Sequence, residues 1–239
     1  MPALEDAPLY QAVDGTGVSL LSKVRGTAGR VYGDGAAIGK GGVDRRFFYG
    51  VKLVALVSDQ GLIHGFISGP ANTEERFLLE GLLRWRADPL AEPPTGEALT
   101  ALLGPSHRHR GQRKGPSGPL GPRYAAGQAT EPIVILADDG YAGQAWQTHW
   151  HEAFDVRVVT QRHARHQRLG RWLAGKRQVV ESAFSRLHDW FALERPRTKS
   201  LLGWWVRLSA KVAAHNAWII LNALWDRPLG AKWDLLALP

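Results

Sequence analysis

The alternation of apolar and polar positions along the chain predicts strands and helices in a defined order. Apolar runs bounded by turn residues predict strands over 9–13, 47–58, 62–67, 133–137 and 156–160. Apolar residues at helical spacing predict helices over about 74–87, 141–152, 168–191 and 201–224. Residues 23–43 are rich in Gly and basic residues without a period, which predicts a loop or a poorly ordered connection.

Local turn and cap residues set several of these boundaries. The first strand is expected to stop at Asp14, because the Gly-Thr-Gly segment 15–17 follows it. The turn at 59–61 joins the second and third strands into a hairpin. Asn72 or Thr73 is expected to cap the first helix, with the two following glutamates in its first turn.

Three strands, a helix, then strand, helix, strand and further helices is the order of an α/β domain with an RNase H-like mixed sheet flanked by helices. Residues 88–132 hold most of the prolines, many glycines and a basic patch over 107–114, which predicts a flexible insertion. We therefore expect one domain over 1–239, interrupted by an insertion at about 88–132.

Amino-acid composition and charge limit which kinds of chemistry and partner the chain can have. The chain has no Cys, which excludes disulfide and thiolate chemistry and suits a cytoplasmic location. Its net charge of +8 favours nucleic acid as a partner. Thirteen Lys and Arg stand against three acidic residues over 157–211, which indicates a phosphate-contacting surface, with a solvated basic face as the alternative. The charge-free stretch 212–225 is too short to cross a membrane.

Acidic residues next to predicted strand ends are the candidates for catalysis. Asp14 and Asp138 each follow an apolar strand, and Glu181 lies on a helix. Mg²⁺ prefers hard oxygen ligands, and two such ions about 4 Å apart support phosphodiester cleavage. Asp14 could instead form a turn, and either Asp138 or Asp139 could be the ligand while the other caps a helix.

A basic residue accompanies the third acid. Arg177, Glu181, Phe184 and His188 recur at helical spacing and form one stripe. Glu181 could point at a metal ion while Arg177 faces DNA phosphate; a plain surface ion pair between them is the alternative. The histidines between 149 and 166 lack the spacing of a closed zinc site.

Four segments carry a combined pattern: AVDGTGV around Asp14, the run from Phe48 to Glu75, ILADDGY from Ile135 to Tyr141, and RQVVESAF from Arg177 to Phe184. Together they resemble the DDE domain of bacterial insertion-sequence transposases. In that family a strand ends in the first Asp, the second Asp precedes a Gly-Tyr pair, and the third acid lies in an Arg-x-x-x-Glu helix. The resemblance implies that Asp14, Asp138 and Glu181 are catalytic and bind metal.

The resemblance further implies a transposase that cleaves DNA strands and joins them to new DNA in recombination. Its cofactors would be two Mg²⁺ ions, for which Mn²⁺ can substitute. Arg177, His188, Lys52 and Lys176 would contact phosphates of double-stranded DNA, both transposon ends and target. Lys52 could instead be a lysine at a sheet edge whose stem covers apolar surface while its ammonium reaches solvent. A homodimer on DNA, no membrane partner and a cytoplasmic location are expected.

Some positions depart from the family pattern. Ala174 and His188 stand where the family often has Tyr and Lys, and Asp14 lies only 13 residues after Met1. Little room remains before Asp14 for a segment that binds transposon ends. These departures favour a second hypothesis, a truncated or inactive remnant that only binds DNA. A third hypothesis is a host nuclease of the same fold.

Overall fold

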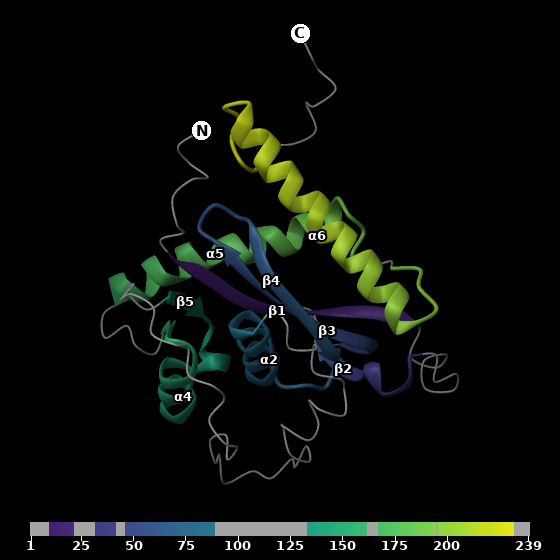
Figure 1. The fold of residues 1–239 in the computed structure, drawn as a ribbon, viewed down its shortest axis with the longest axis horizontal. Helices are drawn as coiled ribbons and strands as arrows, with labels where there is room; N and C mark the ends of the chain where they lie inside the picture. Colours follow the sequence, from purple (N-terminus) through teal and green to yellow (C-terminus); the bar gives the residue numbers. More distant parts are fainter. Residues whose placement is uncertain are drawn as a thin grey trace.

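The computed structural model describes residues 10–21, 32–41, 46–88, 133–161, 167–194 and 196–231. They form a mixed α/β structure in which helices flank a mixed sheet (Figure 1). The strands are β1 (Gln11–Leu21), β2 (Ala37–Gly41), β3 (Arg46–Ser58), β4 (Ile63–Pro70), β5 (Ile133–Ala137) and β6 (Val156–Thr160). The helices are α2 (Glu75–Ala87), α4 (Gln144–Phe154), α5 (Gln167–Asp189) and α6 (Leu201–Leu224), with two short 3-10 helices, η2 (Gly33–Gly35) and η3 (Asp139–Tyr141).

The sheet is antiparallel in one part and parallel in the other. Its order is β2-β3-β1-β5-β6, and β4 also pairs with β3. The long strand β3 pairs with β1 along one side, whereas β2 and β4 share its other side. β1, β5 and β6 run parallel to one another. A parallel pair needs a crossover, and α4 supplies it between β5 and β6.

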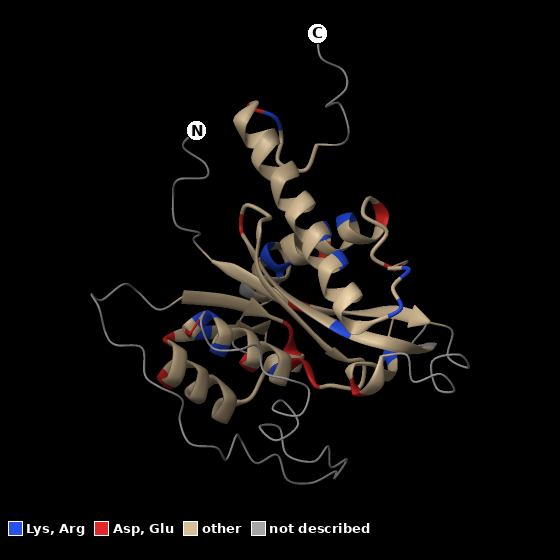
Figure 2. Ribbon diagram, turned by 45° about the vertical axis from the view of Figure 1, so that its right-hand side comes forward, with Lys and Arg blue, Asp and Glu red and all other residues tan. Residues whose placement is uncertain are grey.

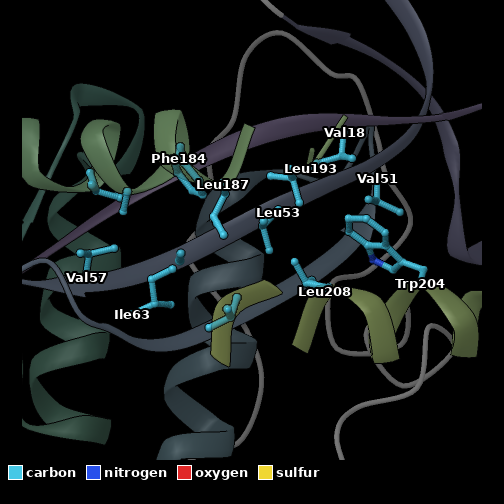
Figure 3. Close-up of a cluster of buried hydrophobic side chains, with 14 of the residues drawn as sticks. Val18, Val51, Leu53, Val57, Ile63, Phe184, Leu187, Leu193, Trp204 and Leu208 are labelled. Carbon is cyan, nitrogen blue, oxygen red and sulfur yellow. The ribbon is translucent and has the colours of Figure 1, made fainter. Parts of the chain in front are cut away.

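Both faces of the sheet are buried. On β3, Leu53 and Val57 join the core beneath α5 and α6, whereas Val54 and Leu56 join the core beneath α2 and α4. This double burial explains why the sequence of β3 is apolar almost throughout. Figure 3 shows the first core, where side chains of β3 meet Phe184 and others from the helices. Full burial of each such side chain contributes about 1.5–3 kcal/mol relative to exposure.

Helix α6 is joined to β4 by polar contacts as well as by apolar packing. Trp204 donates from Nε1 to Oγ of Ser68 over 2.9 Å. The Asn216 amide accepts from the backbone N–H of Ile63 and donates to its carbonyl, both at 2.9 Å. These bonds satisfy backbone groups at the start of an edge strand, which would otherwise be open for pairing. In the described ranges no helix, α6 included, is long and apolar enough to cross a membrane.

Most predicted elements are confirmed. Strands over 133–137 and 156–160, the helix over 201–224 and the antiparallel hairpin of β3 and β4 lie where the pattern placed them. The helix expected over 141–152 begins later, at Gln144, because η3 occupies the preceding residues. Beyond Asp88, the predicted insertion lies outside the described residues.

Three boundary predictions were wrong. β1 does not stop at Asp14 but continues to Leu21, because the backbone over 14–21 pairs with β3. The expected loop over 23–43 contains β2, a Gly-rich edge strand that is held by backbone pairing with β3. Neither Asn72 nor Thr73 caps α2; the backbone N–H of Thr73 closes a turn onto Pro70, and Glu74 is the N-cap.

Candidate active site

The sheet topology brings Asp14 and Asp138 together. β1 and β5 pair in parallel through Gln11 with Ile135 and Ala12 with Leu136. Asp14 and Asp138 each lie two residues beyond the second of these pairs. β5 ends at Ala137, whereas β1 continues, so the two carboxyl groups lie where β1 extends past its neighbour.

The carboxylate of Asp14 is mostly buried and already has partners. Its Oδ1 accepts from the backbone N–H of Gly15 over 2.7 Å, and its Oδ2 accepts from Nη2 of Arg177 over 3.2 Å. Burial raises the pKa of Asp14 above its ordinary value, and the charges of Asp138 and Glu75 add to the rise; the Gly15 amide and Arg177 oppose it. The net rise of the pKa means that the surroundings of Asp14 disfavour the charged form of its carboxyl group.

Arg177 connects Asp14 to the third predicted acid. Its Nη2 lies 3.5 Å from Oε1 of Glu181, which is one turn further along α5. The side chain of Glu181 is 58% exposed, whereas that of Arg177 is 14% exposed. The surface pair considered as an alternative therefore exists, but the same guanidinium nitrogen also binds Asp14. The helix face predicted from the Arg-x-x-x-Glu spacing is turned toward β1.

Asp138 and Asp139 differ in their surroundings. Asp138 is the N-cap of η3, and its Oδ1 accepts from the backbone N–H of Gly140 over 2.8 Å. Gly140 must be small, because a Cβ there would lie 2.9 Å from that oxygen. Asp139 is exposed. The charge of Asp138 raises the pKa of Asp14, so Asp138 serves both as the cap of η3 and as a neighbour of Asp14.

A fourth acid, Glu75, joins the group, although its position in the sequence indicates only a favourable residue for the first turn of a helix. It opens α2 and forms an ion pair with Lys52 of β3, with 3.2 Å between Oε1 and Nζ. Its carboxyl group lies against Gly15, where an added Cβ would come within 2.9 Å of Cδ. Gly15, which the sequence pattern predicts to form a turn, therefore leaves room for the Glu75 carboxyl group beside β1.

Tyr141 is a buried neighbour of these carboxylates. The side chain is fully buried, and its hydroxyl has no hydrogen-bond partner within the described part of the chain. Burial raises the pKa of Tyr141 well above its ordinary value, and the charges of Glu75, Asp14 and Asp138 raise it further. The hydroxyl is thus within electrostatic reach of three carboxylates.

The residues predicted to contact DNA lie around this group but face different ways. Lys52 pairs with Glu75, and His188 lies 3.4 Å through Nε2 from Oγ1 of Thr16 on β1. Lys176 is exposed on α5, and its Nζ lies 5.9 Å from the centre of the Tyr10 ring and 5.7 Å from that of Trp172. Figure 2 shows Lys and Arg along α5, α6 and the turn between them.

The donor set suits Mg²⁺, although the described residues do not present it ready for coordination. Asp14, Asp138, Glu75 and Glu181 all offer carboxylate oxygens, the ligands that Mg²⁺ prefers. Four carboxylates against Arg177 and Lys52 leave an excess of negative charge. Among the described residues, no three His, Cys, Asp or Glu side chains are close enough to hold one ion.

No protein-family model matches the chain, and searches of curated proteins and of solved structures found no similar protein.

Proposed function

We propose that the chain is the DDE catalytic domain of a transposase, with an RNase H-like fold, that cleaves and joins DNA strands with the help of Mg²⁺. Four antiparallel strands, β1 to β4, followed by parallel β5 and β6, with helices on both faces, suit this architecture. The insertion over 88–132 would interrupt the domain between α2 and β5.

One observation carries the proposal above all. Asp14 and Asp138 are adjacent across the parallel pair of β1 and β5, and Arg177 links Asp14 to Glu181. Asp14 and Asp138, which are far apart in the sequence, thus come close at one edge of the sheet, and Arg177 ties the helix that carries Glu181 to the same strand. A polynucleotidyl transferase needs such a gathering, because acids from separate segments must share metal ions.

Each acid has a defined part in the proposed reaction. Asp14, Asp138 and Glu181 would hold two Mg²⁺ ions, with Mn²⁺ able to substitute. When bound, the ions would supply activation of the attacking water or 3′-hydroxyl and stabilisation of the leaving oxygen. Arg177 would leave Asp14 and turn to a DNA phosphate, because the cations would then neutralise that carboxylate. Glu181, already exposed, can move without breaking core packing.

The substrate would be double-stranded DNA, both transposon ends and target, bound by a homodimer. Arg177, Lys52, Lys176 and His188 would contact phosphates, with further basic residues along α5 and α6. Such contacts release counterions, so binding should weaken steeply as the salt concentration rises.

Strand cleavage and joining test the proposal directly. Purified protein is incubated with Mg²⁺ or Mn²⁺ and a plasmid that carries the gene with its flanking DNA, and nicked, excised and joined products are counted. We expect Asp14→Asn, Asp138→Asn and Glu181→Gln to reduce these products to the metal-free level. Asp139→Asn and the exposed Glu152→Gln on α4 serve as matched controls. Absence of products with the unaltered protein, or full activity of Asp138→Asn, would refute catalysis at this site.

A second function, DNA binding without catalysis, is favoured by the ion pairs that already occupy Asp14 and Glu75. In a remnant of this kind, Arg177 and Lys52 would be permanent structural partners of these acids. DNA affinity that falls with salt but is the same with Mg²⁺ and with a chelator, in the absence of any cleavage, would support this second function.

A further inference from the structure

The carboxyl groups of Asp14 and Glu75 lie on opposite faces of the sheet at β1. Asp14 lies on the face covered by α5, since it binds Arg177. Its neighbours Val13 and Gly15 point the other way, because side chains alternate along a strand; Val13 lies in the core beneath α2, and the Glu75 carboxyl group lies against Gly15. Beyond Ala137 no described strand covers the β5 side of β1, so carboxylates from both faces can meet there.

The buried hydroxyl of Tyr141 is an independent sign that this place serves a ligand. A buried hydroxyl without a partner destabilises the fold, so it is rarely kept without a use. The Tyr141 ring belongs to the same core as Val13 and the first turns of α2. Among the charged groups near its hydroxyl, Glu75 has the largest effect, before Asp14 and Asp138. A ligand that bridges these acids would come within reach of the Tyr141 hydroxyl.

Lys52 explains why Glu75 is not free in the present structure. The pair has 3.2 Å between Nζ and Oε1, and both side chains are partly exposed, at 21% and 27%. Such partly exposed ion pairs contribute little to stability. A divalent cation can therefore displace Lys52 from Glu75 at small cost.

We propose that Glu75 is a further cation-binding carboxylate of the candidate active site, and that Lys52 is the counter-charge that Glu75 leaves when a divalent cation binds. The proposal rests on the proposed function, because it adds a ligand to the same site. It extends that function by making the first turn of α2 part of the metal site, and by giving Lys52 two states: paired with Glu75 without metal, and available for DNA phosphate with metal.

Binding of Mn²⁺ to the full chain without DNA provides the test, with free Mn²⁺ measured by electron paramagnetic resonance. Glu75→Gln removes the charge and keeps the size, and we expect it to weaken affinity by roughly tenfold or more, the scale found even for groups that only support metal ligands. Lys52→Met should strengthen affinity by about two- to fivefold, because Glu75 is then unpaired. The double variant closes a cycle: Lys52→Met should have little effect once Glu75 is Gln. Glu152→Gln, an equal charge change at an exposed position of α4, should bind as the unaltered chain does.

The outcomes separate this proposal from the proposed function. Weakened binding in Asp14→Asn and Asp138→Asn, with unchanged binding in Glu75→Gln, overturns the role of Glu75 and leaves the proposed function standing. Unchanged binding in all three overturns the metal site itself. Thermal unfolding without metal shows whether each variant is folded. If Glu75→Gln is not folded, Lys52→Met decides: unchanged affinity overturns the proposal, and tighter binding supports it.

Discussion

Arg177 on α5 donates through Nη2 to Oδ2 of Asp14 on β1 over 3.2 Å. The same nitrogen lies 3.5 Å from Oε1 of Glu181, so one guanidinium serves two of the three predicted catalytic acids. Both side chains of the Arg177–Asp14 pair are mostly buried, at 14% and 19% exposure. The pair is consequently shielded from solvent, and its two members should depend strongly on each other.

Replacement of Arg177 by Ala should lower the free energy of unfolding by about 2 kcal/mol, because Asp14 is left charged and without its cation. In the Asp14→Asn background the same replacement should cost much less. Urea unfolding of the four proteins in this cycle gives the coupling between the two residues.

Arg171→Ala is the matched control, since Arg171 is exposed on the same helix. Its effect should stay within about 0.5 kcal/mol. An Arg177→Ala variant as stable as Arg171→Ala would show that the ion pair does not stabilise the fold.

Replacement of Tyr141 by Phe should stabilise the chain in the absence of metal and impair it in function. The change removes a fully buried hydroxyl without a partner in the described residues and keeps the ring, so a gain of about 1 kcal/mol is expected. Chemical unfolding without metal measures the gain, and plasmid nicking measures the loss. Tyr49→Phe, at another buried Tyr near the start of β3, controls for a general effect of the substitution. A Tyr141→Phe variant with lower stability would mean that the hydroxyl is satisfied in solution.

Elements that local pattern specifies could be predicted residue by residue. α6 begins and ends where its apolar period does, and Ser200 caps it by accepting from the backbone N–H of Gly203 over 3.1 Å. β5 and β6 are short strands rich in Ile and Val, and their sequences predict them without information from elsewhere in the chain. In these elements local preference and tertiary packing agree.

The rest depended on partners distant in sequence. Asp14-Gly15 resembles a turn, yet pairing with Ala55 and Val54 keeps it extended. Glu75 looks like an ordinary first-turn acid, and only its contact with Gly15 and its pair with Lys52 place it beside Asp14. Such contacts leave no period or cap in the sequence. The Arg177 and Glu181 spacing did predict a shared helix face, but not that Arg177 would bind Asp14.

Glu80 should be essential for joining α2 to α4. The buried carboxylate accepts from Nε of Arg84 over 2.7 Å, from Nε2 of His149 over 3.1 Å and from Nε1 of Trp150 over 3.0 Å. Replacement by Ala leaves these donors unpaired, and we expect a loss of about 3–5 kcal/mol in urea unfolding. Glu152→Ala, exposed on α4, should change stability by less than about 0.5 kcal/mol.

The pH dependence of Glu80 has a definite sign. Burial raises the pKa of Glu80, but the hydrogen bond and charge of His149 and the contacts of Arg84 outweigh it, so the pKa lies below its ordinary value. A lowered folded-state pKa means that the stabilisation is present above the ordinary pKa and is lost as the pH falls through the folded value. Glu80→Gln should therefore reduce the loss of stability on acidification. An unchanged acid slope in Glu80→Gln would contradict this role.

His215 should make the chain less stable in mild acid. Burial lowers the pKa of His215 from 6.5 to about 4. The hydrogen bond to Asn216 opposes this lowering, and the charge of Arg186 adds a smaller lowering. Between pH 6.5 and 4, His215 is therefore protonated in the unfolded chain but neutral in the folded chain. Stability falls as the pH drops through this window, by roughly 3 kcal/mol in total, and the penalty is complete below about pH 4.

His215→Leu should flatten this part of the stability profile, because Leu is of similar size and does not titrate. His151→Leu is the control, since His151 is exposed on α4 and should leave the slope unchanged. Urea unfolding at half-unit steps from pH 7 to pH 4 distinguishes His215→Leu from His151→Leu. The stabilisation by Glu80 does not interfere, because it is lost only at lower pH. A His215→Leu variant with the slope of the unaltered chain would show that His215 becomes protonated inside the fold, in the space between Phe191 and Asn216.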